Sequence, residues 1–177
     1  MTEDKTPKKG ENPFSARNAA ITAIGAATMY VSQVAMSFLP NIELVSLMVL
    51  LYTRSFGKKT LVMVYLFALI EGLTFGFGIW WINYLYVWTV MYFIAALTKN
   101  IDGAFIFACI NGLYGLFFGA LCSIPYFFVL GIGGGISYFV GGITFDFLHC
   151  AGNFALALVL FTPLDRILKK IAAGHIS

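Results

Sequence analysis

The chain has 177 residues, of which 60% are hydrophobic and 11% are charged, and its formal net charge is +3. This composition excludes an ordinary soluble domain. Because the basic residues are split among positions that flank apolar stretches, their distribution also excludes a nucleic-acid-binding protein. The three cysteines lie in apolar stretches without a CxxC pair, so they predict packing residues and no metal site.

The N-terminal part begins with a polar, Lys-rich segment over residues 1–12, which we expect to be a disordered cytoplasmic tail. A first helix is predicted from Phe14 to about Phe38, and either Asn12-Pro13 or Ser15 starts it. Small residues recur four apart on this helix and form a flat face that another helix can approach closely. They are Ala16, Ala19, Ala20, Ala23 and Ala27.

Five further apolar runs follow the break at Pro40-Asn41, and the first of them is shorter than a full membrane span. They are predicted as helices over Ile42 to Thr53, Thr60 to Phe77, Trp80 to Thr98, Ala104 to Ile124 and Ile136 to Lys170. Pro125 is expected to end the fifth helix. The glycine-rich segment Gly131–Gly135 is expected to form a flexible loop over a binding site, and residues 171–177 a short cytoplasmic tail.

The basic residues sort to one side of this arrangement. Six helices place both termini on the same side, and every Lys and Arg then falls in the tails and loops of that side. An odd number of helices would destroy this sorting. By the positive-inside rule that side is cytoplasmic. The sequence therefore predicts an all-α polytopic membrane protein, with a bundle of six transmembrane helices over residues 13–170 and both termini cytoplasmic.

A polar stripe interrupts the last apolar stretch. Asp146, His149 and Asn153 are spaced i, i+3, i+7, so on a helix they share one face. An ionisable group costs ~2.5–3.5 kcal/mol near the centre of a membrane helix, so such groups usually face a bundle interior or a wet cavity. The stripe indicates either a small-molecule site or an interhelical hydrogen-bond clamp without a ligand.

Other polar side chains reach a similar depth, because counting along the helices places Glu71, Asn83 and Tyr84 in the outer half of the membrane. We predict a substrate cavity between the third, fourth and sixth helices, lined by Glu71, Asn83, Tyr84, Trp88, Asp146, His149 and Asn153. The aromatic side chains that begin the fourth helix fit an interfacial belt equally well. Glu43, in the first turn of the second helix, is expected among lipid headgroups.

The sequence contains no catalytic or metal-binding pattern. His149 is interpreted as a hydrogen-bonding interior residue, since no second His or carboxylate pair stands at ligand spacing. A Ser-His-Asp order, an HExxH motif and a Walker motif are all lacking. No enzymatic activity and no permanently bound cofactor are therefore predicted, and any use of ATP must belong to a partner.

The strings PNIELVSLMVLLYTRSFGKK and GIWWINYLYVWT, with the six helices and the Ala-x-x-x-Ala face, resemble the S components of energy-coupling factor (ECF) transporters. These are the vitamin-binding subunits of a bacterial ABC-type importer. The resemblance covers Ala16 to Lys170 and is greatest to the cobalamin-specific type. It implies capture of a vitamin, cobalamin first, at the outer face of the bacterial cell membrane.

The resemblance also implies partners. A transmembrane scaffold subunit would dock on the Ala face of the first helix, two cytoplasmic ATPase subunits would hydrolyse ATP, and the whole S component would rotate to release its substrate inward. Three alternatives stay open: an S component for another water-soluble vitamin, a stand-alone ion-coupled carrier that uses Glu71 and Asp146, and a structural membrane protein whose polar groups only bind helices together.

Overall fold

The computed structural model describes residues 15–174, so the tail expected over residues 1–12 lies outside the described residues. The described part is helical, without strands. Its helices are α1 (Ala16–Ala35), α2 (Val45–Phe56), α3 (Lys59–Phe75), α4 (Ile79–Tyr84), α5 (Val87–Leu97), α6 (Ala104–Val129) and α7 (Gly131–Ala173). Since α4 and α5 continue each other as one 19-residue apolar run, Ile79–Leu97, the helices form the six runs that the sequence predicts.

Three of these runs are long and apolar enough to cross a membrane, namely Ile79–Leu97, Ala104–Val129 and Gly131–Ala173. By contrast, α2 has 12 residues and extends only ~18 Å, well short of a hydrocarbon core of ~30 Å. This part of the prediction, an all-α chain with helices suited to a membrane, is confirmed.

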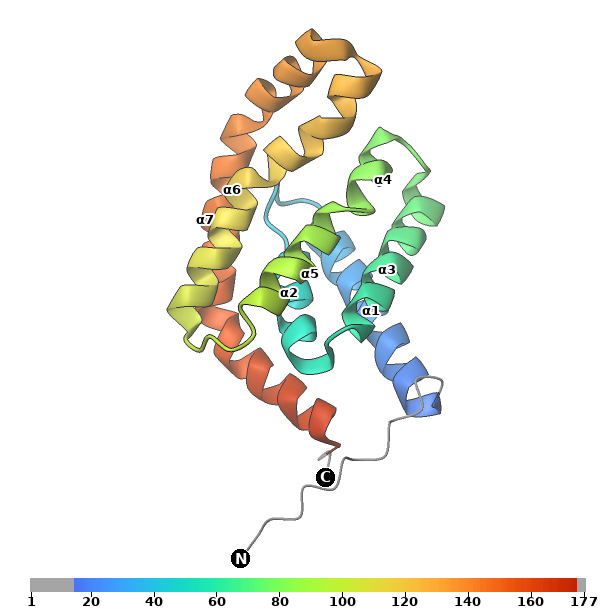
Figure 1. Ribbon diagram of the computed structural model, residues 1–177, viewed down its shortest axis with the longest axis vertical. Coiled ribbons are helices and arrows are strands. Elements are labelled where there is room, and N and C mark those ends of the chain that lie inside the picture. Colours follow the sequence, from blue (N-terminus) through green and yellow to red (C-terminus); the bar gives the residue numbers. More distant parts are fainter. Residues whose placement is uncertain (1–14, 175–177) are drawn as a thin grey trace, which may run out of the picture.

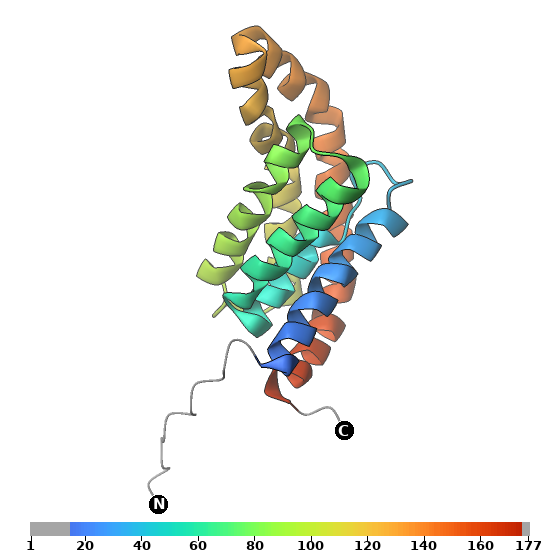
Figure 2. The same cartoon turned by 90° about the vertical axis from the view of Figure 1, so that its right-hand side faces the viewer.

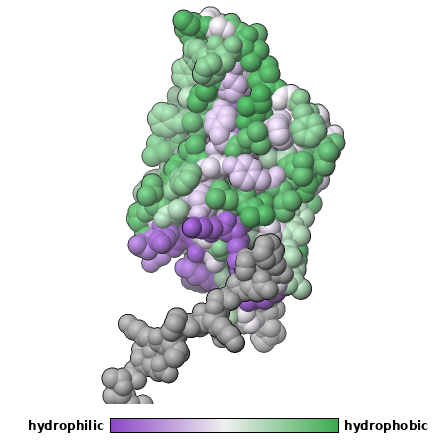
Figure 3. Space-filling view, turned by 45° about the vertical axis from the view of Figure 1, so that its right-hand side comes forward, coloured by the Kyte–Doolittle hydropathy of each residue, from purple (hydrophilic) through white to green (hydrophobic). Residues whose placement is uncertain are grey.

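The two ends of the bundle differ in charge. The first turn of α1 and the last turns of α7 lie at the same end (Figure 1). Every Lys and Arg among residues 15–174 belongs to the helix ends and turns there, and Figure 3 shows this hydrophilic end below a largely apolar surface. We call it the cationic end. At the opposite end, the hairpin end, the turn between α6 and α7 projects beyond the other helices (Figure 2).

Helix α2 occupies the centre of the bundle. Almost all its residues from Val45 to Thr53 are buried, and most of them are apolar. It packs mainly against α5 on one side and α7 on the other. Its two ends therefore lie beside two different levels of α7, one near the hairpin end and one near the cationic end.

Close packing of α6 on α7 depends on three glycines. Gly112, Gly115 and Gly119 face α7, and a Cβ atom on Gly115 would lie 2.9 Å from the His149 carbonyl oxygen. A Cβ atom on Gly119 would overlap the carboxylate of Asp146. Glycine is required here so that the two backbones can approach. This spacing aligns the polar residues of α7 with α6.

The structure corrects several predicted boundaries. Helix α2 begins at Val45 and not at Ile42, and the predicted fourth helix is interrupted between Tyr84 and Val87. Ser15 starts α1, since its hydroxyl accepts a hydrogen bond from the Asn18 amide at 3.2 Å.

The largest corrections concern the hairpin. Pro125 does not end α6, which continues to Val129. Proline removes the bond to the Leu121 carbonyl, but the Tyr86 hydroxyl donates to that oxygen at 2.6 Å instead. The expected flexible loop Gly131–Gly135 is the first turn of α7. A single residue with positive φ, Gly131 at 72°, reverses the chain.

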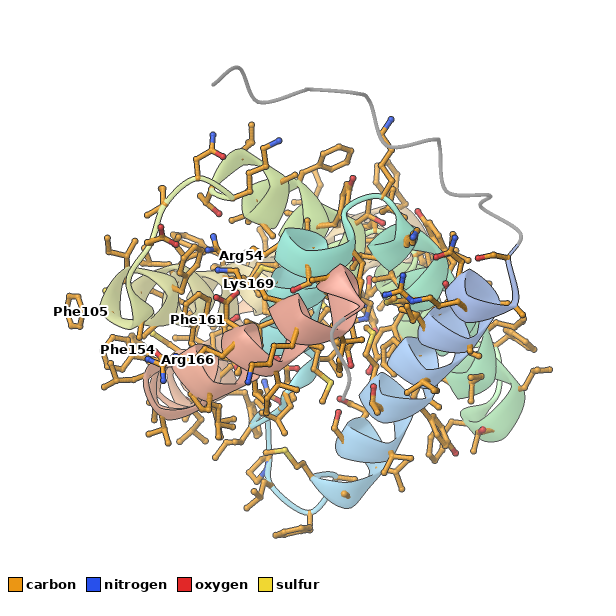
Figure 4. The ribbon with its side chains drawn as sticks, turned by 90° about the horizontal axis from the view of Figure 1, so that it is seen from below. Arg54, Phe105, Phe154, Phe161, Arg166 and Lys169 are labelled. Atoms are coloured by element: carbon orange, nitrogen blue, oxygen red, sulfur yellow. The ribbon has the colours of Figure 1, made fainter. Side chains whose placement is uncertain are left out.

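At the cationic end, Arg54 ties α2 to α7 and to the turn before α6. Its Nη1 donates to the carbonyl oxygens of Lys99 and Ile101, both at 2.9 Å. Its Nη2 lies 3.0 Å from Asp102 Oδ1, and its Nε lies 3.4 Å from Asp165 Oδ1. We call these residues, with Phe107, Phe161 and Lys169, the Arg54 cluster. Figure 4 labels its members Arg54, Phe161 and Lys169 in a view from below.

Aromatic packing and a second ion pair complete the Arg54 cluster. The guanidinium carbon lies 4.4 Å from the centre of the Phe107 ring, which stacks on Phe161. Lys169 Nζ lies 2.7 Å from Asp165 Oδ2. The Arg54 side chain is only 4% exposed, so its charge is buried but has several partners.

Candidate functional site

Three adjoining cavities occupy the half of the bundle nearer the hairpin end. We name each after its acidic residue: the Glu43 cavity of about 340 Å³, the Asp146 cavity of about 500 Å³ and the Glu71 cavity of about 240 Å³. Gln33, Ser37 and Tyr84 line both the Glu43 and the Glu71 cavities. Asn41 and Phe118 line both the Glu43 and the Asp146 cavities. The three cavities therefore share walls.

The Glu43 carboxylate lies beside the first of these cavities and accepts hydrogen bonds from α2 and α7. Its Oε1 accepts from His149 Nε2 at 3.1 Å and from Asn153 Nδ2 at 3.0 Å. Its Oε2 accepts from the Ser46 amide at 2.8 Å, and the Ser46 hydroxyl also donates to the carboxylate. Glu43 thus caps the start of α2 and holds two residues of the polar stripe of α7.

This geometry constrains His149. An ionised carboxylate oxygen only accepts, so Nε2 of His149 carries a hydrogen when Glu43 is ionised. The other ring nitrogen, Nδ1, has no hydrogen-bond partner among residues 15–174. It is therefore an acceptor if the ring is neutral and a second donor if the ring is charged. The ring itself packs edge-on against Phe118, with 4.8 Å between ring centres.

Other buried polar atoms around the cavities also lack partners in the described part of the chain: Gln33 Oε1, Glu71 Oε1 and Trp88 Nε1. Trp88 Nε1 is an obligate donor, whereas Gln33 Oε1 is an acceptor. An unpaired buried polar group costs ~1–3 kcal/mol, so such atoms are uncommon in a core that serves stability alone. Five of the eight such atoms among the described residues belong to side chains in this half of the bundle, and the other three are Ser55 Oγ, Thr60 Oγ1 and Asn111 Oδ1. The five beside the cavities would suit a molecule that offers both donors and acceptors.

Asp146 belongs to a different wall of the site. Its Oδ1 accepts a hydrogen bond from the Gly119 amide at 2.9 Å, which joins α7 to α6. Asp146 lines the Asp146 cavity together with Cys122, Tyr138 and the pair Gly141-Gly142. Asp146 and His149 therefore face neighbouring cavities, although they lie one turn apart on α7.

The sequence-predicted residues lie in this half of the bundle but do not all line cavities. Tyr84, Trp88 and His149 line the Glu43 cavity, Glu71 lines the Glu71 cavity, and Asp146 lines the Asp146 cavity. Asn83 accepts a hydrogen bond from the Tyr86 hydroxyl, and Asn153 donates hydrogen bonds to Glu43 and Ser46. Neither asparagine lines one of the three cavities. All seven side chains are at least partly buried.

Sequence reasoning missed Glu43, Gln33 and Phe118. Glu43 is only 7% exposed and does not lie at an open surface. The fold brings it into contact with His149 of α7, which is 106 residues away in the sequence. The available signal was an acidic residue just before a helix start, which favours an interaction with the free N–H groups of the first turn and predicts no contact with α7. Phe118 and Gln33 carry no such signal in a chain rich in apolar helices.

Comparisons give no relative for this arrangement: no family model matches the chain, and neither a curated protein nor a solved structure matches it significantly. Within residues 15–174, no three His, Cys, Asp or Glu side chains come together in a way that could hold a metal ion. The site must therefore be interpreted from its own geometry.

Proposed function

We propose that the chain is a membrane-embedded S component that binds a water-soluble vitamin, with cobalamin as the first candidate. The observation that carries the proposal is the set of three wall-sharing cavities at the hairpin end, beside buried donors and acceptors without partners in the described part of the chain. A protein that only anchors or spaces other subunits has no need of such a set. A binding protein does.

The proposed orientation follows from charge. With six spans and the cationic end in the cytoplasm, the hairpin end faces outward and the cavities lie in the outer half of the membrane. A vitamin arriving from outside would then reach the Glu43 cavity past the segment that joins α1 to α2, since Pro40 and Asn41 line that cavity. The bacterial cell membrane is the proposed location.

The predicted docking face supports a scaffold partner. Ala16, Ala19, Ala20, Ala23 and Ala27 are all exposed. The buried residues of the same helix, among them Gly25 and Met29, point into the bundle. A small-residue face that the described part of the chain leaves open suits close approach by a helix of another subunit. In this proposal two cytoplasmic ATPases drive release, and this chain is not an enzyme.

The lining supports a neutral, polar ligand. No Lys or Arg of the described residues lines any of the three cavities, so the lining offers no permanent positive charge to pair with an anionic substrate. Cobalamin carries many amide groups, which offer both donors and acceptors. Ligand pockets for drug-sized molecules measure ~300–1,000 Å³, and a corrinoid is larger than a drug. Cobalamin would therefore occupy more than one cavity, whereas a smaller vitamin would fit the Glu43 cavity alone.

One observation favours a second candidate, an ion-coupled carrier. Glu43, Glu71 and Asp146 are all buried in the same half of the bundle, and buried acids in membrane helices often serve ion or proton transfer. Such a carrier would work without ATPase partners.

A vitamin-binding screen on the purified full chain tests the proposal. We expect one vitamin to bind saturably at one site, and mass spectrometry of ligand retained through purification should identify it. Uptake that requires the ATPase partners supports the S component; uptake that persists without them and follows an ion gradient supports the carrier. The absence of any saturable binding would overturn both.

A further inference from the structure

Another hollow, separate from the three cavities of the candidate site, lies toward the cationic end. It is a groove of about 390 Å³ between α1, α2 and the last turns of α7. We call it the α1–α7 groove. Its walls are mainly apolar: Ala20, Ile21, Ile24, Phe56, Leu168 and Ile171. The two hydroxyl groups at the groove, on Thr28 and Tyr52, form a hydrogen bond with each other at 2.6 Å, so an occupant of the groove does not need to supply a polar partner for them.

One end of the α1–α7 groove is cationic. Arg17 is the charged residue among those lining it. The Arg17 Nη2 atom donates to the carbonyl oxygens of Ile171 and Ala172, at 2.8 and 3.3 Å, which holds the guanidinium at the C-terminal end of α7. Lys170, in the same last turn, is exposed. A positive group thus stands where the apolar walls end.

We propose that the α1–α7 groove binds one acyl chain of an anionic phospholipid, with the phosphate beside Arg17 and Lys170. The apolar walls suit an alkyl chain, and the charge at the end suits an anionic headgroup. The groove opens on a surface where Ile24 is 64% exposed, so a membrane lipid can enter it sideways. The inference rests on the proposed membrane location, but not on the identity of the vitamin.

The test uses the purified full chain in detergent, with dioleoylphosphatidylglycerol as the anionic probe and dioleoylphosphatidylcholine as the neutral one. Retained lipid is counted by native mass spectrometry. We expect one tightly held phosphatidylglycerol and a preference for it over phosphatidylcholine. Arg17→Gln should reduce that preference about fivefold, whereas Arg17→Lys, which keeps the charge, should retain most of it.

Two further variants separate the groove from the general surface. Ile24→Trp should fill the α1–α7 groove and remove the tightly held lipid. Leu73→Trp, at a position on α3 that is 70% exposed and outside the groove, should leave lipid retention unchanged. Lys58→Gln, a matched charge change elsewhere at the cationic end, should leave the preference within about twofold of the wild type.

Three results would overturn the proposal: equal retention of both lipids by the wild type, an unchanged preference in Arg17→Gln, or lipid retention unaffected by Ile24→Trp. If Ile24→Trp instead removes only co-purification with a scaffold subunit, the occupant is a protein side chain and not a lipid. Failure of vitamin binding leaves each of these lipid measurements intact, so the two proposals fail separately.

Discussion

The two ends of α2 carry two buried ionic clusters of different character. At the cationic end, Arg54 contacts two carbonyl oxygens, two carboxylates and an aromatic ring. At the hairpin end, Glu43 has four hydrogen bonds, but its neighbours His149 and Asn153 each carry a polar atom without a partner in the described residues. Three cavities surround only the second cluster.

This difference separates stability from function. A buried charge with many partners fixes the relative position of helices, because removing it takes a counter-charge from its less exposed partner, here Asp165 at 11% exposed. Buried polar atoms without hydrogen-bond partners reduce the stability of the folded chain, so their presence beside cavities calls for an explanation other than folding. We therefore assign the Arg54 cluster to stability and, under the proposed function, assign Glu43 with Ser46, His149 and Asn153 to ligand recognition.

The largest expected effect is on the Arg54 cluster. Arg54→Met should lower the free energy of unfolding by ~2–3 kcal/mol. Removing one partner of a fully buried ion pair costs ~3–5 kcal/mol, but Asp102 is 88% exposed and Lys169 still pairs with Asp165. Denaturant unfolding of the purified protein measures this. The control is Lys169→Met, at a side chain that is 54% exposed, which should cost less than ~1 kcal/mol. Equal losses of unfolding free energy in the two variants would contradict the claim that the buried Arg54 contacts stabilise the fold more than the surface Lys169 contact does.

The next effect concerns the contact of α6 with α7. Gly119→Ala should lower the free energy of unfolding by ~1–3 kcal/mol and weaken ligand binding, because the new methyl group would overlap the Asp146 carboxylate. Gly133→Ala is the matched control: no atom lies within 4 Å of its added Cβ, and it should be neutral or stabilise the helix by up to ~1 kcal/mol. A normal melting temperature for Gly119→Ala would contradict the close packing.

A smaller effect, on binding only, is expected at the cavities. Trp88→Phe keeps an aromatic ring but removes a buried N–H donor that has no partner in the described residues. If a ligand accepts from this donor, its affinity should fall about three- to tenfold, with little change in stability. Equilibrium binding measures the loss. Unchanged affinity together with a more stable protein would show that the orphaned donor is only a defect of the core.

The smallest effect on ligand affinity is expected on the exposed face of α1. Ala19→Trp should leave vitamin binding to the isolated chain unchanged within about twofold, while co-purification with a scaffold subunit and vitamin uptake fall, since the face works by close backbone approach. A loss of vitamin binding equal to the loss of docking would place this face in the pocket or the core.

The comparison also shows what the sequence could predict. The spacing of Asp146, His149 and Asn153 placed them on one face of a helix, and all three are buried there. The sorting of Lys and Arg predicted one cationic end. Both features depend only on sequence spacing or on the distribution of charges along the chain, so they can be predicted without knowing how the helices pack.

The failures all involve contacts between different helices or the turns beside them. Helix α6 continues past Pro125 although proline cannot donate a hydrogen bond to the Leu121 carbonyl. The Tyr86 hydroxyl, 35 residues from Leu121 in the sequence, donates to that carbonyl instead. The glycines after Leu130 are helical, and a Cβ atom on Gly135 would overlap the Phe127 ring of α6, so glycine is required for this close approach. Glu43 joins the site through His149, 106 residues away. Neither the periodicity of the sequence nor local conformational propensity predicts these contacts.

The most direct test of the central claim, that the hairpin-end cavities bind a vitamin, is equilibrium binding of cobalamin to the purified chain, compared between the wild type and Glu43→Gln. This substitution replaces one carboxylate oxygen with an amide N–H group, which would stand among four donors, so the network that holds His149 should loosen. We predict saturable one-to-one binding by the wild type and at least about tenfold weaker binding by a folded Glu43→Gln variant. Equal affinity in both proteins would contradict the account, as would the absence of saturable binding by the wild type.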